Sequence, residues 1–349
     1  MSLCLTLAIR FVTLAGVVFI VLGLVVITLG ATGFSDKILD ATIREELRGY
    51  RESLAQTVRD PQRLEDTLKA RRNELEVFYG IDMAWYRRLP DMAQRVITLD
   101  LGEARTLRSF SGSPHVASMV MERLPYTLLL VGTSTIITTV LGLWLGVKLA
   151  THAGTGLDRA VSYLSAGSYA LPAWWTGILL ILLLAFQIRI FPSGGMYSTP
   201  PPEVGLFRFL DLLRHAALPI ITLVLVSIGS WIYTVRSMVL NTSQEFFVTV
   251  ARAKGLSEGT VMRRYIIRPS APPIITNIIF GLAGSLGGAI LIETVFNWPG
   301  MGRMYYDAIV SADESVVVAL TFMFTLIYVI ARFLLEIIYL VLDPRIRYT

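Results

Sequence analysis

Long apolar runs dominate this 349-residue sequence and restrict its possible folds more than any other feature. Several of them reach about 18 residues or more, the length at which an α-helix crosses the hydrocarbon core of a bilayer. Hydrophobic residues make up 54% of the chain and charged residues only 16%, with a mean hydropathy of +0.61. Since water-soluble chains do not hold several such runs, we expect an all-α membrane protein with several spans.

Six membrane-spanning helices are predicted from the apolar runs. The first run is longer than the apolar region of a signal peptide, about 7–15 residues, so we expect a retained helix. Pro172 is expected to kink the third span, and residues 192–215, rich in Pro, Gly and Ser, are expected to form a loop. The predicted spans are residues 8–32, 124–149, 160–191, 216–239, 274–296 and 316–342.

The segment between the first two spans, residues 34–121, is too highly charged to lie in lipid. It holds 14 basic and 14 acidic residues. Apolar residues at helical spacing over residues 38–58, then Asp60-Pro61 as a helix start and Gly80 as a stop, predict a helical hairpin. This hairpin either only packs on the membrane helices or is a docking surface for an external partner.

Basic residues in the short loops predict the orientation of the chain. Eleven of them fall on the side that holds both termini and residues 243–273, against four on the opposite side. Because short loops rich in Lys and Arg stay in the cytoplasm, both termini are expected inside and residues 34–121 outside. The same rule accounts for the net charge of +5, so nucleic-acid binding is not predicted.

A basic segment, Glu245 to Pro273, interrupts the apolar pattern with five Lys or Arg residues and two Glu residues. Its pattern predicts one short amphipathic helix before Gly255 and a second from Ser257, which can cap that helix. Glycine reaches positive φ at low cost, so Gly255 permits a sharp turn between the two. Such a segment between two spans can transmit force to them, although a plain cytoplasmic loop that obeys the positive-inside rule is the alternative.

The sequence predicts no catalytic activity and no metal or cofactor site in this chain. Cys4 is the only cysteine, the three histidines fall in three different loops, and no GxxxxGK[ST] motif occurs. We therefore expect no catalytic residue, no metal site and no cofactor in this chain, and no ATP hydrolysis by it.

Three motifs point to a family: ARAKGLS at residues 251–257, ETVFNWPGMG at 293–302 and DPRIRY at 343–348. In this combination the chain resembles the permease subunits of binding-protein-dependent ABC importers in the dipeptide, oligopeptide and nickel branch, of the first-permease type with a long external loop. LPYTLLL, PSGG, HAALPIITL and GIDMAWYRRL with TLDLG are similar to that branch as well. The resemblance covers residues 80–349, whereas the hairpin at residues 36–79 matches less well.

The resemblance implies that the basic segment is the EAA loop, whose helix couples a permease to an ATPase. The three EAA positions read Thr249-Val250-Ala251 here, so the glutamate of the general pattern is missing and the charged contacts to the ATPase stay open. The coupling residues implied are Glu245, Thr249, Ala251, Arg252, Ala253, Lys254, Gly255, Leu256, Ser257 and Glu258.

A pathway or gate is expected around the fifth span. Its small residues, Gly281, Gly284, Ser285, Gly287, Gly288 and Ala289, suit close packing in a bundle or a dimer. Glu293 should face a partner or a watery cavity and have a structural or gating role. Trp298-Pro299-Gly300 resembles the external turn of the family, where a binding protein docks or a gate closes. On the sixth span, Arg332 and Glu336 are expected to pair.

The expected protein is a permease of a prokaryotic inner membrane that imports peptides by alternating access. Its implied partners are a second homologous permease, two ATPase subunits that bind ATP and Mg, and an extracytoplasmic solute-binding protein. Expected parts are a first helix (1–33), an external helical domain (34–121) and a five-helix core (122–349) with the coupling loop at 243–273. Alternatives are oligosaccharides or nickel chelates as substrates and, more remotely, an ion-coupled secondary transporter or a membrane-embedded enzyme.

Overall fold

The computed structural model describes residues 3–31, 34–55, 60–79, 94, 98, 100–286 and 289–342. Within this part the regular structure is helical, apart from one isolated bridge between Glu103 and His115. The predicted all-α class is therefore confirmed. The chain divides into two compact bodies, the first formed by Met1–Ala8, Arg123–Arg303 and Ile327–Thr349 and the second by Ile9–Glu122 and Met304–Leu326.

Four helical segments of the described chain are long and apolar enough to cross a membrane: Val116–Thr151, Leu206–Ser243, Glu258–Gly284 and Glu314–Leu335. Two shorter apolar helices, Val12–Val21 and Ala173–Gln187, fall where the first and third spans were predicted. These segments agree with the predicted membrane class, and the number of six spans stays a prediction.

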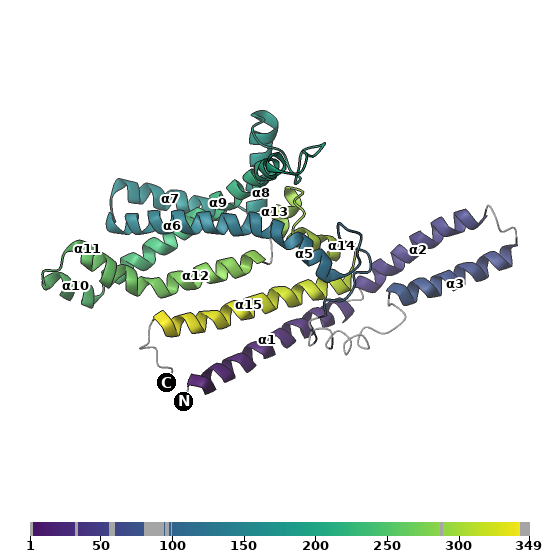
Figure 1. Cartoon of the computed structure of the whole chain (residues 1–349), viewed down its shortest axis with the longest axis horizontal. Helices are drawn as coiled ribbons and strands as arrows, with labels where there is room; N and C mark the ends of the chain where they lie inside the picture. Colours follow the sequence, from purple (N-terminus) through teal and green to yellow (C-terminus); the bar gives the residue numbers. More distant parts are fainter. Residues whose placement is uncertain are drawn as a thin grey trace. The chain divides into compact units, whose positions relative to one another are not determined.

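Most helical segments that lie wholly or partly in the first body come between residues 116 and 295, and three of them are π-helical. In chain order they are α5 (Val116–Thr127), η2 (Leu128–Gly132), α6 (Thr133–Thr151), α7 (Gly156–Ala170), α8 (Ala173–Leu180), η3 (Ile181–Gln187), α9 (Leu206–Ser243), α10 (Phe246–Ala253), α11 (Glu258–Thr260), η4 (Val261–Ile267), α12 (Arg268–Leu286) and α13 (Ile290–Val295). Helices α6 and α7 both pack along α9 (Figure 1).

Glycines set the close approach of these three helices. A Cβ on Gly229 of α9 would lie 2.7 Å from Ser165 Cα of α7 and would also meet Ser168 Oγ. On α6, a Cβ on Gly146 would lie 2.7 Å from Val235 Cβ. Close packing through the small residues of the fifth span, in a bundle or a dimer, stays a prediction, and a Cβ on Gly281 would lie 3.6 Å from Thr135 Cγ2. At Gly284 nothing lies within 4 Å of a Cβ.

Gly229→Ala is expected to destabilise the first body by about 2 kcal/mol, because an added methyl group must push α7 away from α9. Thermal unfolding of the detergent-solubilised chain measures the loss. Gly167→Ala on α7 is the matched control, since nothing lies within 4 Å of its Cβ and alanine favours the helix. Equal stability of the two variants would contradict the close approach.

Two predicted boundaries around the third and fourth spans are wrong. Pro172 does not kink a continuous span; α7 ends at Ala170, Leu171 is extended (φ −91°, ψ 122°), and α8 starts after the proline and runs in a different direction (Figure 1). A residue before proline avoids the helical region, which explains the break. Helix α9 begins at Leu206, so the second half of the predicted loop is helical.

The fifth span also differs from its prediction. Its helix is continuous from Glu258 through η4 to Leu286, although Pro272 and Pro273 lie inside it. Proline removes one donor but keeps a helical φ, and membrane helices tolerate it. The second short helix of the basic segment is therefore the start of this long helix. Near its end, Ala289 leaves the helical region (φ −112°, ψ 80°), and α13 is a separate element.

The second body contains the predicted helical hairpin. Helices α2 (Phe34–Ala55) and α3 (Pro61–Tyr79) pack together, and Asp60 Oδ1 accepts a hydrogen bond from the Gln62 N–H at 3.0 Å, as the helix-start signal predicts. The other helices of this body are parts of α1 (Leu3–Ala31), α14 (Met301–Val310) and α15 (Glu314–Leu342).

The hairpin and the loop after it are fixed to the turn between α14 and α15. Ile43 and Leu75 are buried against Ala312 of that turn. The buried Asp313 carboxylate accepts hydrogen bonds from the backbone N–H groups of Thr106 at 2.7 Å and Leu107 at 3.2 Å. These contacts support a packing role for one face of the hairpin, and its outer face stays available for the docking role.

Candidate functional site

Helix α10 follows α9 directly and is anchored on one face only. Val248 and Ala251 are 0% and 2% exposed and pack with Val235 and Val239 of α9. The other face carries Phe246, which is 79% exposed. The hydrophobic effect explains the first face, whereas an exposed aromatic side chain beside polar residues is typical of a protein interface.

The turn after α10 has the geometry that the sequence predicts. Gly255 has φ +74°, a region that glycine enters without strain, and its N–H donates to Arg252 O at 2.9 Å. Ser257 occupies the N-cap position of the next helix, but its side chain makes no cap bond and instead contacts Thr260 Oγ1 at 2.9 Å. The predicted break is therefore confirmed, and the predicted side-chain cap is wrong.

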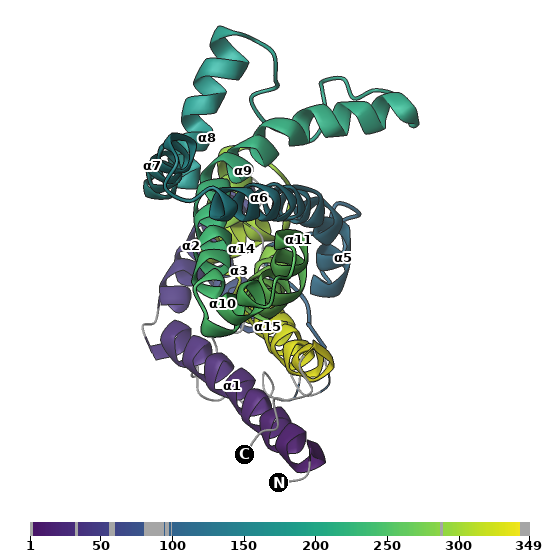
Figure 2. The same ribbon diagram turned by 90° about the vertical axis from the view of Figure 1, so that its left-hand side faces the viewer.

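The remaining coupling residues gather at the same end of the first body, which faces the viewer in Figure 2 with α10 and α11. Glu245 is the N-cap of α10. Arg252 Nε donates to Glu258 Oε1 at 3.0 Å, so these two charges compensate each other. The other members of the set, Thr249, Ala253, Lys254 and Leu256, are exposed.

A polar hollow of about 610 Å³ lies beside this turn. Its lining residues are Ser257, Gly259, Thr260, Arg263 and Arg264. Both arginines are exposed, as is Arg268 one turn further along. The arrangement offers guanidinium and hydroxyl donors, which suit an anionic group.

Glu293 is fully buried in the first body and holds the turn that follows it. Its Oε1 accepts from Thr127 Oγ1 at 3.0 Å, and its Oε2 accepts from the Arg303 N–H at 2.9 Å. Thr127 in turn accepts from the Met301 N–H at 2.7 Å. The carboxylate therefore joins α5 to α13 and to the Trp298-Pro299-Gly300 turn. These contacts favour the structural or gating role over direct contact with substrate.

The turn itself is buried against α5 and α9. Trp298 is 0% exposed, packs with Leu130 and Ala216, and donates from Nε1 to Tyr126 O at 3.1 Å. A Cβ on Gly300 would lie 2.5 Å from Glu293 Oε2, so any larger residue there must displace the carboxylate. The indole is therefore buried within the first body, and the role of the turn in docking or in gating stays a prediction.

The other predicted residues of the pathway, and the predicted pair on the sixth span, stay predictions. Gly284 is exposed and has no close neighbour in this chain, while Gly288 lies outside the described residues. Pro299 is half-buried. The predicted pair of Arg332 and Glu336 involves a Glu336 side chain that is also outside the described part.

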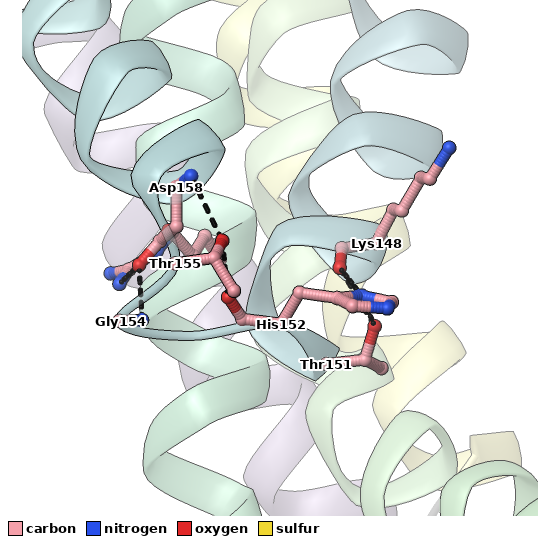
Figure 3. A network of polar contacts seen from close by, with 7 residues as sticks. Lys148, Thr151, His152, Gly154, Thr155 and Asp158 are labelled. Carbon is pink, nitrogen blue, oxygen red and sulfur yellow. Dashed lines mark hydrogen bonds and ion pairs between the residues drawn. The ribbon is translucent and has the colours of Figure 1, made fainter.

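Sequence reasoning missed an ion pair between α7 and α9. Asp158, with a side chain 3% exposed, accepts from Arg236 Nε at 2.5 Å and Nη2 at 2.6 Å, and from the Gly154 N–H at 2.9 Å. Figure 3 shows Gly154, Thr155 and Asp158 at the loop between α6 and α7, where Thr155 Oγ1 accepts a hydrogen bond from the Asp158 N–H and caps the start of α7. The guanidinium of Arg236 lowers the pKa of the Asp158 carboxyl.

Thr127 was missed as well. It lies within the segment LPYTLLL, and its burial at 0% exposure marks it as a core polar residue. A single threonine at the start of an apolar run carries no signal of its own. The ion pair of Asp158 did have a signal in the sequence, since an acid and an arginine occur at the ends of neighbouring predicted spans.

Comparison with known proteins assigns the family. Residues 138–348 match the model of the binding-protein-dependent transport system inner membrane component. The chain is 32% identical over 239 residues to the oligopeptide transport system permease protein AppB of Bacillus subtilis, which covers 68% of this chain and 73% of AppB. It is 31% identical over 287 residues to the di/tripeptide transport system permease protein DppB of Pseudomonas aeruginosa, covering 77% and 83% of the two chains. The chain therefore belongs to the family of binding-protein-dependent transport system inner membrane components, the permeases of ABC importers, in the dipeptide, oligopeptide and nickel branch to which its motifs point.

Proposed function

We propose that this chain is a transmembrane permease subunit that moves peptides into the cytoplasm of a prokaryote by alternating access. Relatives named as oligopeptide and di/tripeptide permeases support the substrate class. The observation that carries the mechanism is α10, with one face anchored through Val248 and Ala251 and the other face exposing Phe246. Such a helix can receive a push from a partner and pass it to α9.

The chain works in this proposal as half of a pathway with six spans and cytoplasmic termini. A second homologous permease supplies the other half, two ATPase subunits bind α10 and its counterpart, and a solute-binding protein delivers peptide outside. Closure of the ATPases around ATP moves the coupling helices and opens the cavity outward, and hydrolysis returns it inward. The permease itself makes and breaks no covalent bond.

Two elements would serve the outer side. The buried assembly of Glu293, Thr127 and Gly300 supports the turn at Trp298 as part of the outer gate. The hairpin α2–α3 would receive the solute-binding protein on the face that does not pack against Ala312. The contact of the adjoining loop with Asp313 at the start of α15 supports this proposal by holding the loop in position.

Purification of the tagged chain from native membranes in mild detergent tests the assembly. We expect mass spectrometry to identify a second permease, ATPase subunits and a solute-binding protein. Proteoliposomes that contain this complex should take up labelled di- and oligopeptides when ATP is enclosed. A chain that is recovered alone and transports along an ion gradient would instead indicate a secondary carrier.

Gly255→Val is expected to lower peptide uptake at least about tenfold while ATPase activity continues, because a β-branched side chain is strained at φ +74°. The turn then shifts α10 relative to the helix that starts at Glu258. Uptake and ATP hydrolysis are measured in the same proteoliposomes.

Gly255→Asn is the matched control at this position, since asparagine tolerates positive φ and should retain most of the uptake. Normal uptake by the valine variant would contradict the role of the turn in coupling.

A further inference from the structure

Charge pairing leaves the surface beside α10 cationic. Glu258, the acid nearest the turn, pairs with Arg252 and accepts hydrogen bonds from its guanidinium at 3.0 and 3.3 Å. Within the described part of the chain, neither Arg263 nor Arg264 pairs with a carboxylate. Thr249 stands where the general EAA pattern has a glutamate. The surface therefore has cations where an acid would be expected.

The hollow at Arg263 and Arg264 has room and donors for more than one acidic group. Its volume is about 610 Å³, and Gly259 leaves it open because no atom lies within 4 Å of a Cβ at that position. Ser257 and Thr260 use one hydroxyl hydrogen in their mutual 2.9 Å contact, so the other hydroxyl hydrogen can reach a ligand. The guanidinium groups of the arginines and a hydroxyl group can donate hydrogen bonds to the two oxygens of a carboxylate.

We propose that this hollow receives acidic side chains of the ATPase subunit, so that the permease contributes the cations of the coupling contact. This inference rests on the proposed function, in which α10 meets an ATPase. It assigns Arg263 and Arg264 to a contact that the resemblance assigned only to residues 245–258.

A protein partner fits this surface better than lipid does. The segment η4, which carries both arginines, packs on α10 through Val261 and Ile266, so the hollow is fixed to the helix that exposes Phe246. Aromatic and arginine side chains together are enriched in protein interfaces. The positive-inside rule would account for basic residues on this side of the membrane, but it does not require a hollow or hydroxyl groups beside them.

The proposal is tested by measuring how well the complex in nanodiscs retains its ATPase subunits over a series of NaCl concentrations. Arg263→Ala/Arg264→Ala should weaken retention by about tenfold to hundredfold and flatten its dependence on salt. Arg263→Lys/Arg264→Lys keeps the charge and hence the membrane orientation, and should recover part of the affinity with a full salt dependence. Arg268→Ala removes an exposed arginine outside the lining and should leave retention unchanged.

The outcomes separate the alternatives. Equal retention by the double alanine variant and the wild type would overturn the inference. A loss that occurs only in nanodiscs with anionic phosphatidylglycerol, and not in phosphatidylcholine, would overturn it in favour of lipid headgroups. A wild-type chain that retains no ATPase in either lipid at any salt concentration would contradict the proposed function itself.

Discussion

Arg236→Ala is expected to lower the free energy of unfolding by about 3 kcal/mol, because it leaves the buried Asp158 carboxylate without its cation. Asp158 keeps only the Gly154 N–H at 2.9 Å after this change. Unfolding by heat in detergent measures the loss. Since α7 and α9 meet at this pair, the loop between α6 and α7 should also become more accessible to proteases.

The pH dependence of this effect has a definite sign. The hydrogen bonds from Arg236 hold the pKa of the Asp158 carboxyl below its ordinary value of about 3.9. The pair therefore contributes fully above that ordinary value, and its contribution is lost as the pH falls through the lowered pKa of the folded state. The difference between wild type and Arg236→Ala should be constant near neutral pH and shrink in acid.

A double variant separates charge from packing. Asp158→Asn/Arg236→Met removes both charges, keeps an acceptor for the Gly154 N–H and keeps an extended side chain at 236. Most of the lost stability should return, since replacing a buried pair by neutral groups is often tolerated. If the double variant is as unstable as Arg236→Ala, then the guanidinium contributes through packing rather than through charge.

Gly300→Ala is expected to have the largest effect on transport. The added Cβ would lie 2.5 Å from Glu293 Oε2 and 2.6 Å from Thr127 Oγ1, so the buried carboxylate must move. A displaced Glu293 loses hydrogen bonds from Thr127 and Arg303 at a buried position, at a cost of about 3 kcal/mol. Peptide uptake into proteoliposomes should fall at least about tenfold, with ATPase subunits still bound to the complex.

Gly132→Ala is the control for this change. It lies five residues after Thr127 in the same helical run, and nothing occurs within 4 Å of its Cβ. Normal uptake is expected for it. Loss of ATPase binding in Gly300→Ala would mean that the whole first body is disrupted, and unchanged uptake would remove the turn from the gate.

The two ends of the first body are thus held together by different interactions. At the α10 end, an ion pair joins α7 to α9 and a glycine turn positions α10 against the start of the next helix. At the Trp298 turn, a buried carboxylate joins α5, α13 and the turn itself. In the proposed mechanism, a motion that begins at α10 would reach the rest of the body through α9, which packs with both α6 and α7.

Features that depend on neighbouring residues could be predicted from the sequence alone. The apolar runs indicate membrane helices, Asp60-Pro61 starts α3, and Gly255 ends the α10 segment with a positive φ. Each depends on local rules of hydrophobic period, capping and backbone freedom. The motifs around Gly255 and Trp298 also sufficed for the family.

Features that depend on distant residues were decided by the tertiary structure. Glu293 finds Thr127 across 166 positions, and Arg236 finds Asp158 across 78. The predicted fifth span starts at residue 274, but the helix already contains Pro272 and Pro273, whereas α7 ends before Pro172. The motif at Trp298 indicated an external turn, but it did not indicate that the indole is buried. A local sequence pattern determines which backbone conformations are low in energy. Which polar groups are buried together is determined only when the helices pack, because every buried polar group must then find a hydrogen-bond partner.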